Sequence, residues 1–486
     1  MRISVIGAGY VGLTTAVCLA HIGHDVFCSE HDADKLAKLK VGAMPVFEPH
    51  LADISRMARK SGRLNFGSTE EAIDWGNALF ICVGTPPLGN GEADLSAIAG
   101  VAKTIAKRAS GYRLVIEKST VPVQTGSQLR KQLAVHNTQR LDYDVASNPE
   151  FLREGSAVED FLHPDRIVIG VESVRAETLL REIYAPITGR TFACPVHSGC
   201  PHNKPARILV TDTNSAELIK HASNSFLAMK ISYINIVADL CEAAGADISK
   251  VAEGVGLDPR IGSSFLQPGI GFGGFCFPKD LQAFVKIAEK FDCDFSLLKE
   301  VERINQRRVE KFVEMIKREL WVLRGKRICV WGLAFKPNTD DVRFAPALSI
   351  IRQLVAEGAQ VQAYDPQAAE KAQTEIPEVT YCQDVYEAAR RAEAVVLLTE
   401  WEEFRRVDWS RLGTLMERPL IIDGRNMLSP EEVVPHGFQY LGIGGVSGIP
   451  EMALAAINPD SVDGKIFDYR IAKAQAQAPG FEPSSQ

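Results

Sequence analysis

The first part of the chain alternates short apolar runs with segments of helical periodicity. The apolar runs are rich in Ile, Val, Leu and Phe and lie at 3–6, 25–29, 78–83, 114–116 and 166–169. Apolar strands separated by helices are typical of a parallel sheet that helices cover on both faces. The pattern therefore predicts a dinucleotide-type α/β domain over residues 1–205.

The middle of the chain has a different pattern. From Ser215 to Ala244 apolar residues recur at helical spacing with few helix breakers, which predicts one long helix with a broad apolar stripe. More helical sequence follows from Leu281 to about Trp321. We therefore expect a central helical domain over residues 206–310.

The alternation of strands and helices then returns. Apolar runs lie at 326–331, 360–364, 394–398 and 420–422. They predict a second doubly wound domain over residues 311–470. The predicted fold class is α/β, with two Rossmann-like parallel-sheet domains joined by a central helical domain. The Gln-, Ala-, Pro- and Ser-rich residues 471–486 predict a disordered tail.

Composition and charge narrow the class of protein. The 486 residues are 46% hydrophobic and 24% charged, which is ordinary for a globular chain, and the net charge is −7. An acidic balance disfavours a general nucleic-acid binder. No apolar run reaches the length of a membrane span, and the first residues lack the features of a signal peptide. We therefore expect a cytoplasmic protein that contacts neither nucleic acid nor membrane, with its ten cysteines reduced.

A glycine motif predicts a dinucleotide site. Gly7, Gly9 and Gly12 follow a strand directly and open a helix, so the turn allows close approach of a pyrophosphate to the helix N-terminus. Glu30 ends the next strand, where a carboxylate binds ribose hydroxyls and disfavours a 2′-phosphate. NAD is thus favoured over NADP, although Lys35 lies close enough to tolerate some phosphate. The alternative interpretation is a packing turn without a ligand.

Two later loops extend this edge of the predicted sheet. Gly84, Thr85 and Pro86 follow one strand, and Thr120 follows the next. Ligands bind outside the carboxyl ends of the strands in open α/β sheets. Together with the glycine motif, the two loops indicate further walls of a cofactor crevice, although either alone is compatible with an ordinary loop.

A glycine-rich segment carries the candidate nucleophile. Four glycines between 269 and 274 precede Cys276, and Pro278 favours the first turn of a helix. A thiol at a helix N-terminus has a lowered pKa. Asp280 lies one turn further on. A thiol beside a carboxylate suits covalent capture of a carbonyl and later hydrolysis. The alternative is a buried structural cysteine.

Two further pairs have the spacing of one helical turn. Lys220 and Asn224 on the predicted long helix can stabilise a developing alkoxide. Glu150 and Glu154 offer a general base or a group that orients water. The alternatives are a snorkelling lysine at a packing edge and a solvated helix face.

The chain resembles the UDP-glucose/GDP-mannose dehydrogenase family from Met1 to about Asp460. The matching motifs, in the family's order, are GAGYVG, VGTP, STVP, NPEFLREG, ELIKHASNSFLA, GFGGFCFPKD, AFKPNTDDVR, LTEWEEF and DGRN. The resemblance implies a four-electron oxidation of UDP-glucose to UDP-glucuronate with two NAD per turnover. It also implies a homodimer or higher homo-oligomer through the central helices, and a product that supplies acidic polysaccharide synthesis.

The resemblance implies roles for individual residues. Cys276 would carry a thiohemiacetal and then a thioester, Lys220 and Asn224 would form the oxyanion site, and Asp280, Glu154 and Thr120 would handle protons and water. The implied NAD contacts are Gly7, Gly9, Tyr10, Val11, Gly12, Glu30, Lys35, Gly84, Thr85, Pro86, Thr120, Glu154, Lys279 and Arg343. The implied substrate contacts are Glu150, Phe151, Leu152, Arg153, Glu154, Lys220, Asn224, Arg260 from a neighbouring subunit, Phe265, Leu266, Gly269, Gly271, Phe272, Gly273, Phe277, Lys336 and Arg425.

Two departures from the family's pattern leave the substrate open. Phe275 replaces a common Ser before the cysteine, and Phe344 replaces a common Glu after the motif arginine. GDP-mannose, a UDP-N-acetylhexosamine and a dTDP-sugar are alternative substrates, although LTEWEEF and DGRN resemble the UDP-glucose branch most. A further alternative is an inactive nucleotide-sugar-binding regulator, which would be expected to have lost Cys276, Lys220 or Asp280.

The implied function assigns no role to one segment of the chain. Cys194, His197, Cys200 and His202 are zinc-ligand types at close spacing. No catalytic metal is expected. The hypothesis for this segment is a structural zinc site, and the alternative is a surface insertion in which these residue types coincide.

Overall fold

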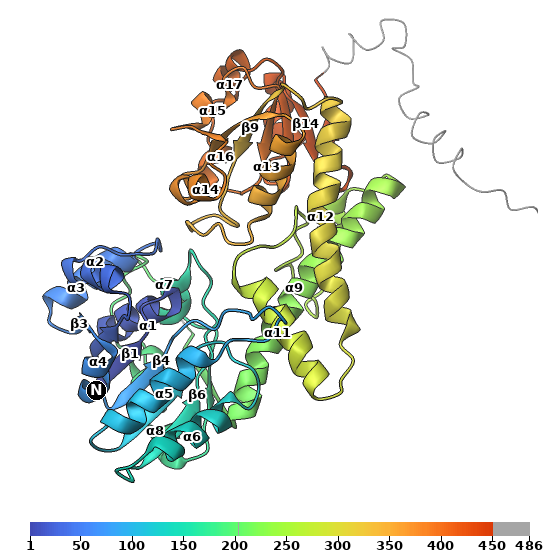
Figure 1. Cartoon of the computed structure of the whole chain (residues 1–486). Helices are drawn as coiled ribbons and strands as arrows, with labels where there is room; N and C mark the ends of the chain where they lie inside the picture. The colour runs from blue at the N-terminus through green and yellow to red at the C-terminus, as the bar shows by residue number, and fades with distance from the viewer. Residues whose placement is uncertain (203, 451–486) are drawn as a thin grey trace, which may run out of the picture.

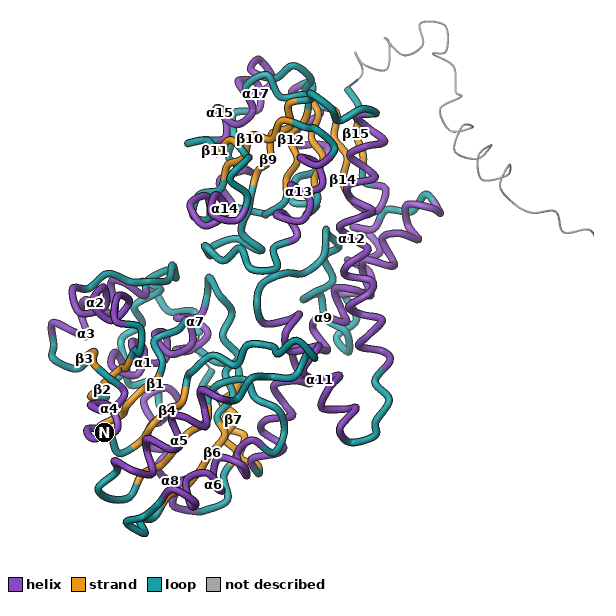
Figure 2. The backbone as a smooth tube through the Cα atoms, viewed as in Figure 1, coloured by secondary structure: helices purple, strands orange, loops and turns teal. Residues whose placement is uncertain are grey.

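The computed structural model describes residues 1–202 and 204–450. Two sheets with their covering helices lie at opposite ends of the molecule, and long helices run between them (Figures 1 and 2). This arrangement confirms the predicted fold class. The predicted tail at 471–486 lies outside the described residues, as does the end of the predicted third domain.

The first sheet has the strand order β3-β2-β1-β4-β5-β6-β7-β8. Its strands are β1 (Arg2–Ile6), β2 (Asp25–Ser29), β3 (Leu64–Gly67), β4 (Ala78–Ile81), β5 (Arg113–Glu117), β6 (Tyr143–Ser147), β7 (Arg166–Gly170) and β8 (Arg207–Thr211). Neighbouring strands are parallel except β6 and β7. The order reverses between β1 and β4, and open α/β sheets bind their ligands at such a point, outside the carboxyl ends of the strands.

Helices cover this sheet because its strands are apolar on both faces. They are α1 (Tyr10–His21), α2 (Ala33–Val41), α3 (Leu51–Lys60), α4 (Thr69–Trp75), α5 (Ser96–Arg108), α6 (Thr125–His136), α7 (Ala157–Leu162) and α8 (Val174–Thr188). Separate hydrophobic clusters form on the two faces. Val5 and Leu13 belong to one cluster, and Ile6 and Ile105 belong to the other.

Four helices form the middle of the molecule: α9 (Thr213–Ala244), α10 (Ile248–Gly256), α11 (Cys276–Lys290) and α12 (Ser296–Leu320). α9 is the predicted long helix. It packs against β7 at one end and against α11 and α12 further along (Figure 1). β8, the last strand of the first sheet, lies wholly beyond the predicted domain limit at 205, and α12 continues past the predicted limit at 310. None of the described helices is long and apolar enough to span a bilayer.

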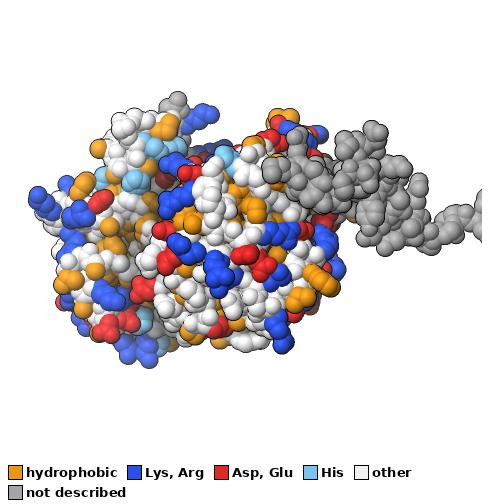
Figure 3. All heavy atoms as spheres, turned by 90° about the horizontal axis from the view of Figure 1, so that it is seen from above, with side chains coloured by type: hydrophobic (Ala, Val, Ile, Leu, Met, Phe, Trp, Pro, Cys, Tyr) orange, Lys and Arg blue, Asp and Glu red, His pale blue; other side chains and the backbone are white. Residues whose placement is uncertain are grey.

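The second sheet repeats the strand order of the first, as β11-β10-β9-β12-β13-β14-β15. Its strands are β9 (Arg327–Trp331), β10 (Gln360–Tyr364), β11 (Thr380–Tyr381), β12 (Ala394–Leu397), β13 (Leu420–Asp423), β14 (Gln439–Gly442) and β15 (Ser447–Gly448). Its helices are α13 (Pro346–Ala356), α14 (Ala369–Glu375), α15 (Val385–Ala389), α16 (Glu402–Arg405), α17 (Trp409–Leu415) and α18 (Pro430–Val433). Short 3-10 turns lie at Val434–His436 and Ile443–Gly445. The face seen from above in Figure 3 intersperses basic and acidic side chains among its described residues.

Candidate active site

The glycine turn after β1 is shaped for close approach of a ligand. Gly7 has φ +102°, and a side chain at Gly12 would collide with the Gly7 carbonyl oxygen at 1.8 Å. Gly9 precedes α1, and a Cβ there would meet no atom within 4 Å. The two tight positions set the turn and the open position leaves the helix N-terminus accessible, so these residues fit a pyrophosphate.

Glu30 occupies the position expected for ribose binding. Its buried carboxylate follows β2 and accepts hydrogen bonds from the backbone N–H groups of His31 and Asp32 at 2.8 and 3.1 Å. Lys35 Nζ lies 3.0 Å from Glu30 Oε2. Burial raises the pKa of Glu30, but the Asp32 N–H and Lys35 outweigh burial, so the pKa lies below its ordinary value. Glu30 is therefore ionised at neutral pH, which favours ribose hydroxyls over a 2′-phosphate.

The loops after β4 and β5 meet beside this turn. Thr85 donates its hydroxyl to the Thr120 carbonyl oxygen at 2.8 Å, and Ser119 donates to the Val83 carbonyl oxygen at 2.8 Å. A Cβ at Gly84 would meet no atom within 4 Å. These contacts place Gly84, Thr85, Pro86 and Thr120 along one wall, as the sequence predicted. Tyr10 and Val11 open α1 at the same edge.

Cys276 is the first residue of α11, as Pro278 predicted. It faces a cavity of about 1250 Å³ lined by all three parts of the molecule. The lining includes the predicted substrate residues Phe151, Leu152, Arg153, Glu154, Lys220, Asn224, Phe265, Gly269, Gly271, Phe272, Gly273, Phe277, Lys336 and Arg425. The volume and mixed lining suit a ligand with a polar and an aromatic part.

Some predicted contacts lie away from this cavity. Among the described residues, Thr120, Glu150, Arg260 and Leu266 do not line it. Leu266 is buried in the core, and Glu150 lies behind Lys220. The Arg260 side chain is exposed and pairs with Asp258. A contact of Arg260 with substrate bound to a neighbouring subunit stays a prediction.

The surroundings of the Cys276 thiol raise its pKa, whereas the sequence predicted a lowered pKa. Burial and the nearby carboxylates of Asp280 and Glu150 raise the pKa of Cys276 to about 12, although Lys220 lowers it. The predicted lowering by the helix N-terminus was therefore wrong. The thiol is protonated at neutral pH, so its attack on a carbonyl must be coupled to loss of its proton.

Four groups adjoin the thiol. Lys220 Nζ lies 2.8 Å from Glu150 Oε1, and both side chains are 5% exposed. Burial lowers the pKa of Lys220, but Glu150 and Asp280 outweigh burial and raise it, so the ammonium is retained. Asn224 Nδ2 donates to Asp280 Oδ2 at 2.6 Å.

Asp280 joins these groups to the start of α11. Lys279, a predicted NAD contact, lies 2.8 Å from Asp280 Oδ1. Burial raises the pKa of Asp280, but the charges of Lys279 and Lys220 outweigh burial. The pKa therefore lies below its ordinary value, and the carboxylate is ionised. The site thus holds a cation and a hydrogen-bond donor beside the thiol, which suits stabilisation of an oxyanion.

Glu154 links the first domain to the loop after β9. Its Oε2 accepts a hydrogen bond from Thr339 Oγ1 at 3.3 Å, and its Oε1 lies 3.7 Å from Arg343. Burial and the Asp341 charge raise the pKa of Glu154 to about 7, although Arg343 and Lys336 lower it. A carboxyl group with a pKa near neutrality can act as a general acid or base.

One departure from the family's pattern contacts this loop and the other lies in it. The Arg343 guanidinium lies 4.6 Å from the centroid of the Phe275 ring, and Lys279 Nζ lies 5.7 Å from it. Phe344 is exposed and has φ +50°. Phe275 thus stabilises two cations that a Ser could not contact by cation–π interaction.

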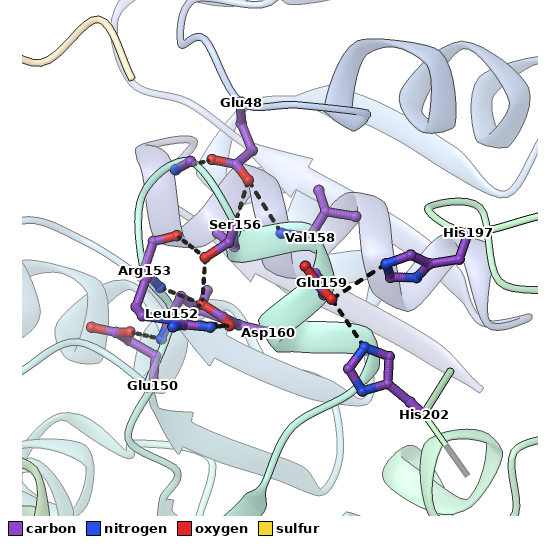
Figure 4. Close-up of polar contacts among 12 residues, drawn as sticks. Glu48, Glu150, Leu152, Arg153, Ser156, Val158, Glu159, Asp160, His197 and His202 are labelled. Carbon is purple, nitrogen blue, oxygen red and sulfur yellow. Dashed lines mark hydrogen bonds and ion pairs between the residues drawn. The ribbon is translucent and has the colours of Figure 1, made fainter. Parts of the chain in front are cut away.

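Sequence reasoning missed the residues that support the loops. Glu48 accepts hydrogen bonds from the backbone N–H groups of Gly155 and Ala157, both at 2.7 Å, and from the Tyr10 hydroxyl. It also accepts a longer hydrogen bond from the Val158 N–H at 3.4 Å (Figure 4). Glu48 therefore joins the turn that carries Glu154 to the cofactor helix. The only signal was a carboxylate between prolines in an otherwise apolar segment.

The glycine-rich loop is supported from α9 and α12. Asn305 accepts from the Phe272 N–H at 2.8 Å and donates to the Phe272 carbonyl at 2.9 Å. Asn235 accepts from the Gly269 N–H at 2.8 Å. Arg425 donates to the Gly271 carbonyl oxygen at 3.0 Å. These contacts fix the backbone ahead of Cys276. Arg425 was expected as a substrate contact, and Asn235 and Asn305 were not expected at the site.

Three features occur together in this chain: a glycine turn that fits a dinucleotide, a cavity lined by a thiol, and two Rossmann-like domains. Together they define a class of NAD-linked dehydrogenases. Three domain models of the UDP-glucose/GDP-mannose dehydrogenase family match this chain. The NAD binding domain matches residues 1–188, the central domain residues 214–307 and the UDP binding domain residues 329–430. The chain belongs to this family. It is an NAD-dependent oxidoreductase.

Individual relatives agree with the family match. A UDP-glucose 6-dehydrogenase from Rhizobium meliloti is 44% identical, with 91% of this chain and 99% of that protein covered. UDP-glucose 6-dehydrogenase TuaD from Bacillus subtilis is also 44% identical, with coverages of 91% and 93%. A UDP-glucose dehydrogenase structure from Pyrobaculum islandicum has a TM-score of 0.80 and 38% identity, covering 88% of this chain and 94% of that one.

Proposed function

We propose that this enzyme oxidises UDP-glucose to UDP-glucuronate, a four-electron reaction that uses two NAD per sugar. The observation that carries the proposal is the Cys276 thiol at the start of α11, with Lys220, Asn224 and Asp280 beside it. An alcohol dehydrogenase that stops at the aldehyde needs no thiol. The relatives named UDP-glucose 6-dehydrogenase, which align over about nine tenths of this chain, support the choice of sugar nucleotide.

The cofactor site is the crevice between Gly7, Gly84 and Glu30. NAD bound there supplies the hydride acceptor for both oxidations. Glu30 orients the ribose, and the N-terminus of α1 accepts the pyrophosphate. Of the other predicted contacts, Glu154 lines the thiol cavity and lies 3.7 Å from Arg343, which supports a role of both residues next to the cofactor.

Covalent capture starts from a protonated thiol. As Cys276 Sγ bonds to the aldehyde carbon, its proton leaves and the carbonyl oxygen becomes the hydroxyl of a thiohemiacetal. Asp280, one turn along α11, relays this proton. The Lys220 ammonium and the Asn224 amide stabilise the negative charge that develops on the oxygen. In the second oxidation the hydroxyl would give its proton to Asp280 while the carbon would lose a hydride to NAD, which would leave a thioester on Sγ.

Hydrolysis then releases the product. Glu154 takes a proton from the attacking water, the carbon–sulfur bond breaks, and Sγ recovers a proton. The product is a carboxylate and the thiol is regenerated. Glu154 is suited to this step because its pKa of about 7 lets it accept a proton at neutral pH.

A pH dependence of hydrolysis follows from Glu154. Since the base must be deprotonated, we expect the single-turnover rate of thioester hydrolysis to fall as pH drops below about 7. Glu154→Gln should lower the plateau rate by about 10²–10⁴-fold and remove this acidic limb. Quenched-flow measurements from pH 5 to pH 9 test both statements. An acidic limb that persists unchanged in Glu154→Gln would assign the base to another group.

We also propose a homodimer formed through the central helices. Exposed apolar side chains on α9 support this proposal, namely Phe226, Tyr233, Ile236 and Leu240. Tyr233 is 59% exposed and Leu240 is 66% exposed, which is unusual on a long central helix. Burial of this face would also place a neighbouring subunit near the central domain, which carries Arg260.

A substrate panel tests the choice of sugar nucleotide. kcat/KM for NADH formation should be about tenfold or more higher with UDP-glucose than with GDP-mannose, a UDP-N-acetylhexosamine or dTDP-glucose. Equal or better turnover of another sugar nucleotide would refute UDP-glucose while leaving the cysteine chemistry intact. Binding of sugar nucleotides without turnover would favour the inactive regulator.

A further inference from the structure

Four side chains with sulfur or nitrogen donor atoms converge at the connection between α8 and β8, beside the substrate cavity. Cys194, His197 and Cys200 lie in this connection, and His163 directly follows α7. Their four donor atoms all lie within 4.8 Å of one another. No proposed catalytic step uses any of them.

Three of the six distances between these atoms are close to the edges of a tetrahedron around a metal. His163 Nε2 lies 3.2 Å from Cys194 Sγ and 3.6 Å from Cys200 Sγ, and Cys194 Sγ lies 3.6 Å from His197 Nδ1. Bonds of about 2.3 Å from zinc to sulfur and 2.0–2.1 Å to nitrogen separate tetrahedral ligand atoms by about 3.3–3.8 Å.

The second ring nitrogen of one histidine faces a carboxylate. His197 directs Nδ1 at the cysteine, and its Nε2 lies 3.5 Å from Glu159 Oε1 on α7 (Figure 4). Metal-ligating histidines usually place their other nitrogen on such a carboxylate, which fixes the ring and raises its basicity. A chance cluster of surface residues would not require this arrangement.

The fourth ligand differs from the one that local spacing suggested. His202 Nε2 lies 2.9 Å from Glu159 Oε1, and its ring stacks on His163 with centroids 4.5 Å apart. His202 is therefore a neighbour of the four-atom cluster, and His163 completes it. His163 precedes Cys194 by 31 residues, so sequence spacing alone could not select it.

We propose that His163, Cys194, His197 and Cys200 bind one structural Zn²⁺. A tetrahedral set of two thiolates and two imidazoles favours zinc among the common metals, and four protein ligands leave no open position for catalysis. This site is independent of the proposed function.

The metal would fix one wall of the substrate cavity. On α7, Glu159 faces the histidines, whereas the adjacent Asp160 accepts a hydrogen bond from the Arg153 N–H at 2.8 Å and pairs with its guanidinium (Figure 4). His163 itself lines the cavity. Zinc would thus tie the α8–β8 connection to the helix whose Asp160 binds the predicted substrate residue Arg153.

Metal analysis of untagged, chelator-washed protein tests the proposal. We expect about one zinc per chain in the unaltered protein and in the matched control Cys293→Ser, which removes an exposed cysteine outside the cluster. Cys194→Ser, Cys200→Ser and His163→Ala should each lose nearly all of it. His202→Ala should retain it, because His202 is not a ligand.

Second measurements keep the test decisive if a variant fails to fold. Cobalt exchanged into the unaltered protein should give the visible ligand-field and thiolate charge-transfer bands of a tetrahedral site. Glu159→Gln, which keeps all four ligands, should weaken zinc binding by about 10–100-fold. Absence of zinc, or a Cys194–Cys200 disulfide detected by thiol titration of the isolated protein, would overturn the proposal. Zinc that survives His163→Ala but not His202→Ala would overturn the ligand set.

Discussion

Replacing Cys276 by Ser is expected to lower UDP-glucuronate formation by about 10³-fold or more while NAD affinity stays unchanged. The thiol is the one group at the cavity that can hold the aldehyde as an adduct and then leave as a thiolate when water attacks. A serine hydroxyl is a weaker nucleophile and a poorer leaving group. The residues expected to hold the pyrophosphate and ribose of NAD, from Gly7 to Glu30, belong to the first domain, whereas Cys276 begins α11, so NAD affinity should not change.

The comparison uses steady-state rates and NAD titrations of Cys276→Ser and Cys293→Ser. Cys293 is exposed and lies beyond the end of α11, so its replacement controls for loss of a thiol outside the cavity. Near-normal acid formation by Cys276→Ser would refute covalent catalysis. Equal losses in both variants would point to general damage by substitution of cysteine.

Lys220→Met is expected to have two separable effects. Loss of the ammonium beside the thiol should lower kcat by about 10²–10³-fold, because the developing oxyanion loses its charged partner. Glu150 would also be left buried without the partner that lies 2.8 Å from it. Breaking such a buried pair costs about 3–5 kcal/mol of unfolding free energy.

The double variant Lys220→Met/Glu150→Gln separates these effects. Removing the carboxylate charge should restore most of the stability, measured by urea unfolding, but not the rate. Recovery of kcat in the double variant would show that Lys220 acts only through folding. A kcat within about tenfold of normal in Lys220→Met would remove Lys220 from the oxyanion site.

Local patterns predicted the parts of the fold and site that depend on neighbouring residues. The turn at Gly7 requires glycine for a backbone reason, and Pro278 marks the start of α11, so Cys276 could be placed at a helix N-terminus. The α9 helix was visible because its apolar spacing continues with few breakers. The same reasoning indicated that Lys220 and Asn224 share one face of α9.

Properties set by distant segments could not be read from the sequence. The pKa of Cys276 is raised by burial and by carboxylates that include Glu150 from the first domain, so helix position alone gave the wrong direction. Glu48 and Asn305 act through backbone groups far along the chain and belong to no recognised motif. His163 joins the cysteine cluster only after α7 and the α8–β8 connection come together.

The stoichiometry of NADH formed per UDP-glucose tests the central claim most directly. A limiting amount of UDP-glucose is oxidised to completion with excess NAD, and NADH is measured by its absorbance while the sugar product is identified by mass. The account predicts two NADH and one UDP-glucuronate per sugar, because Cys276 holds the aldehyde for the second oxidation. One NADH with free aldehyde as the product would contradict the thioester route through Cys276.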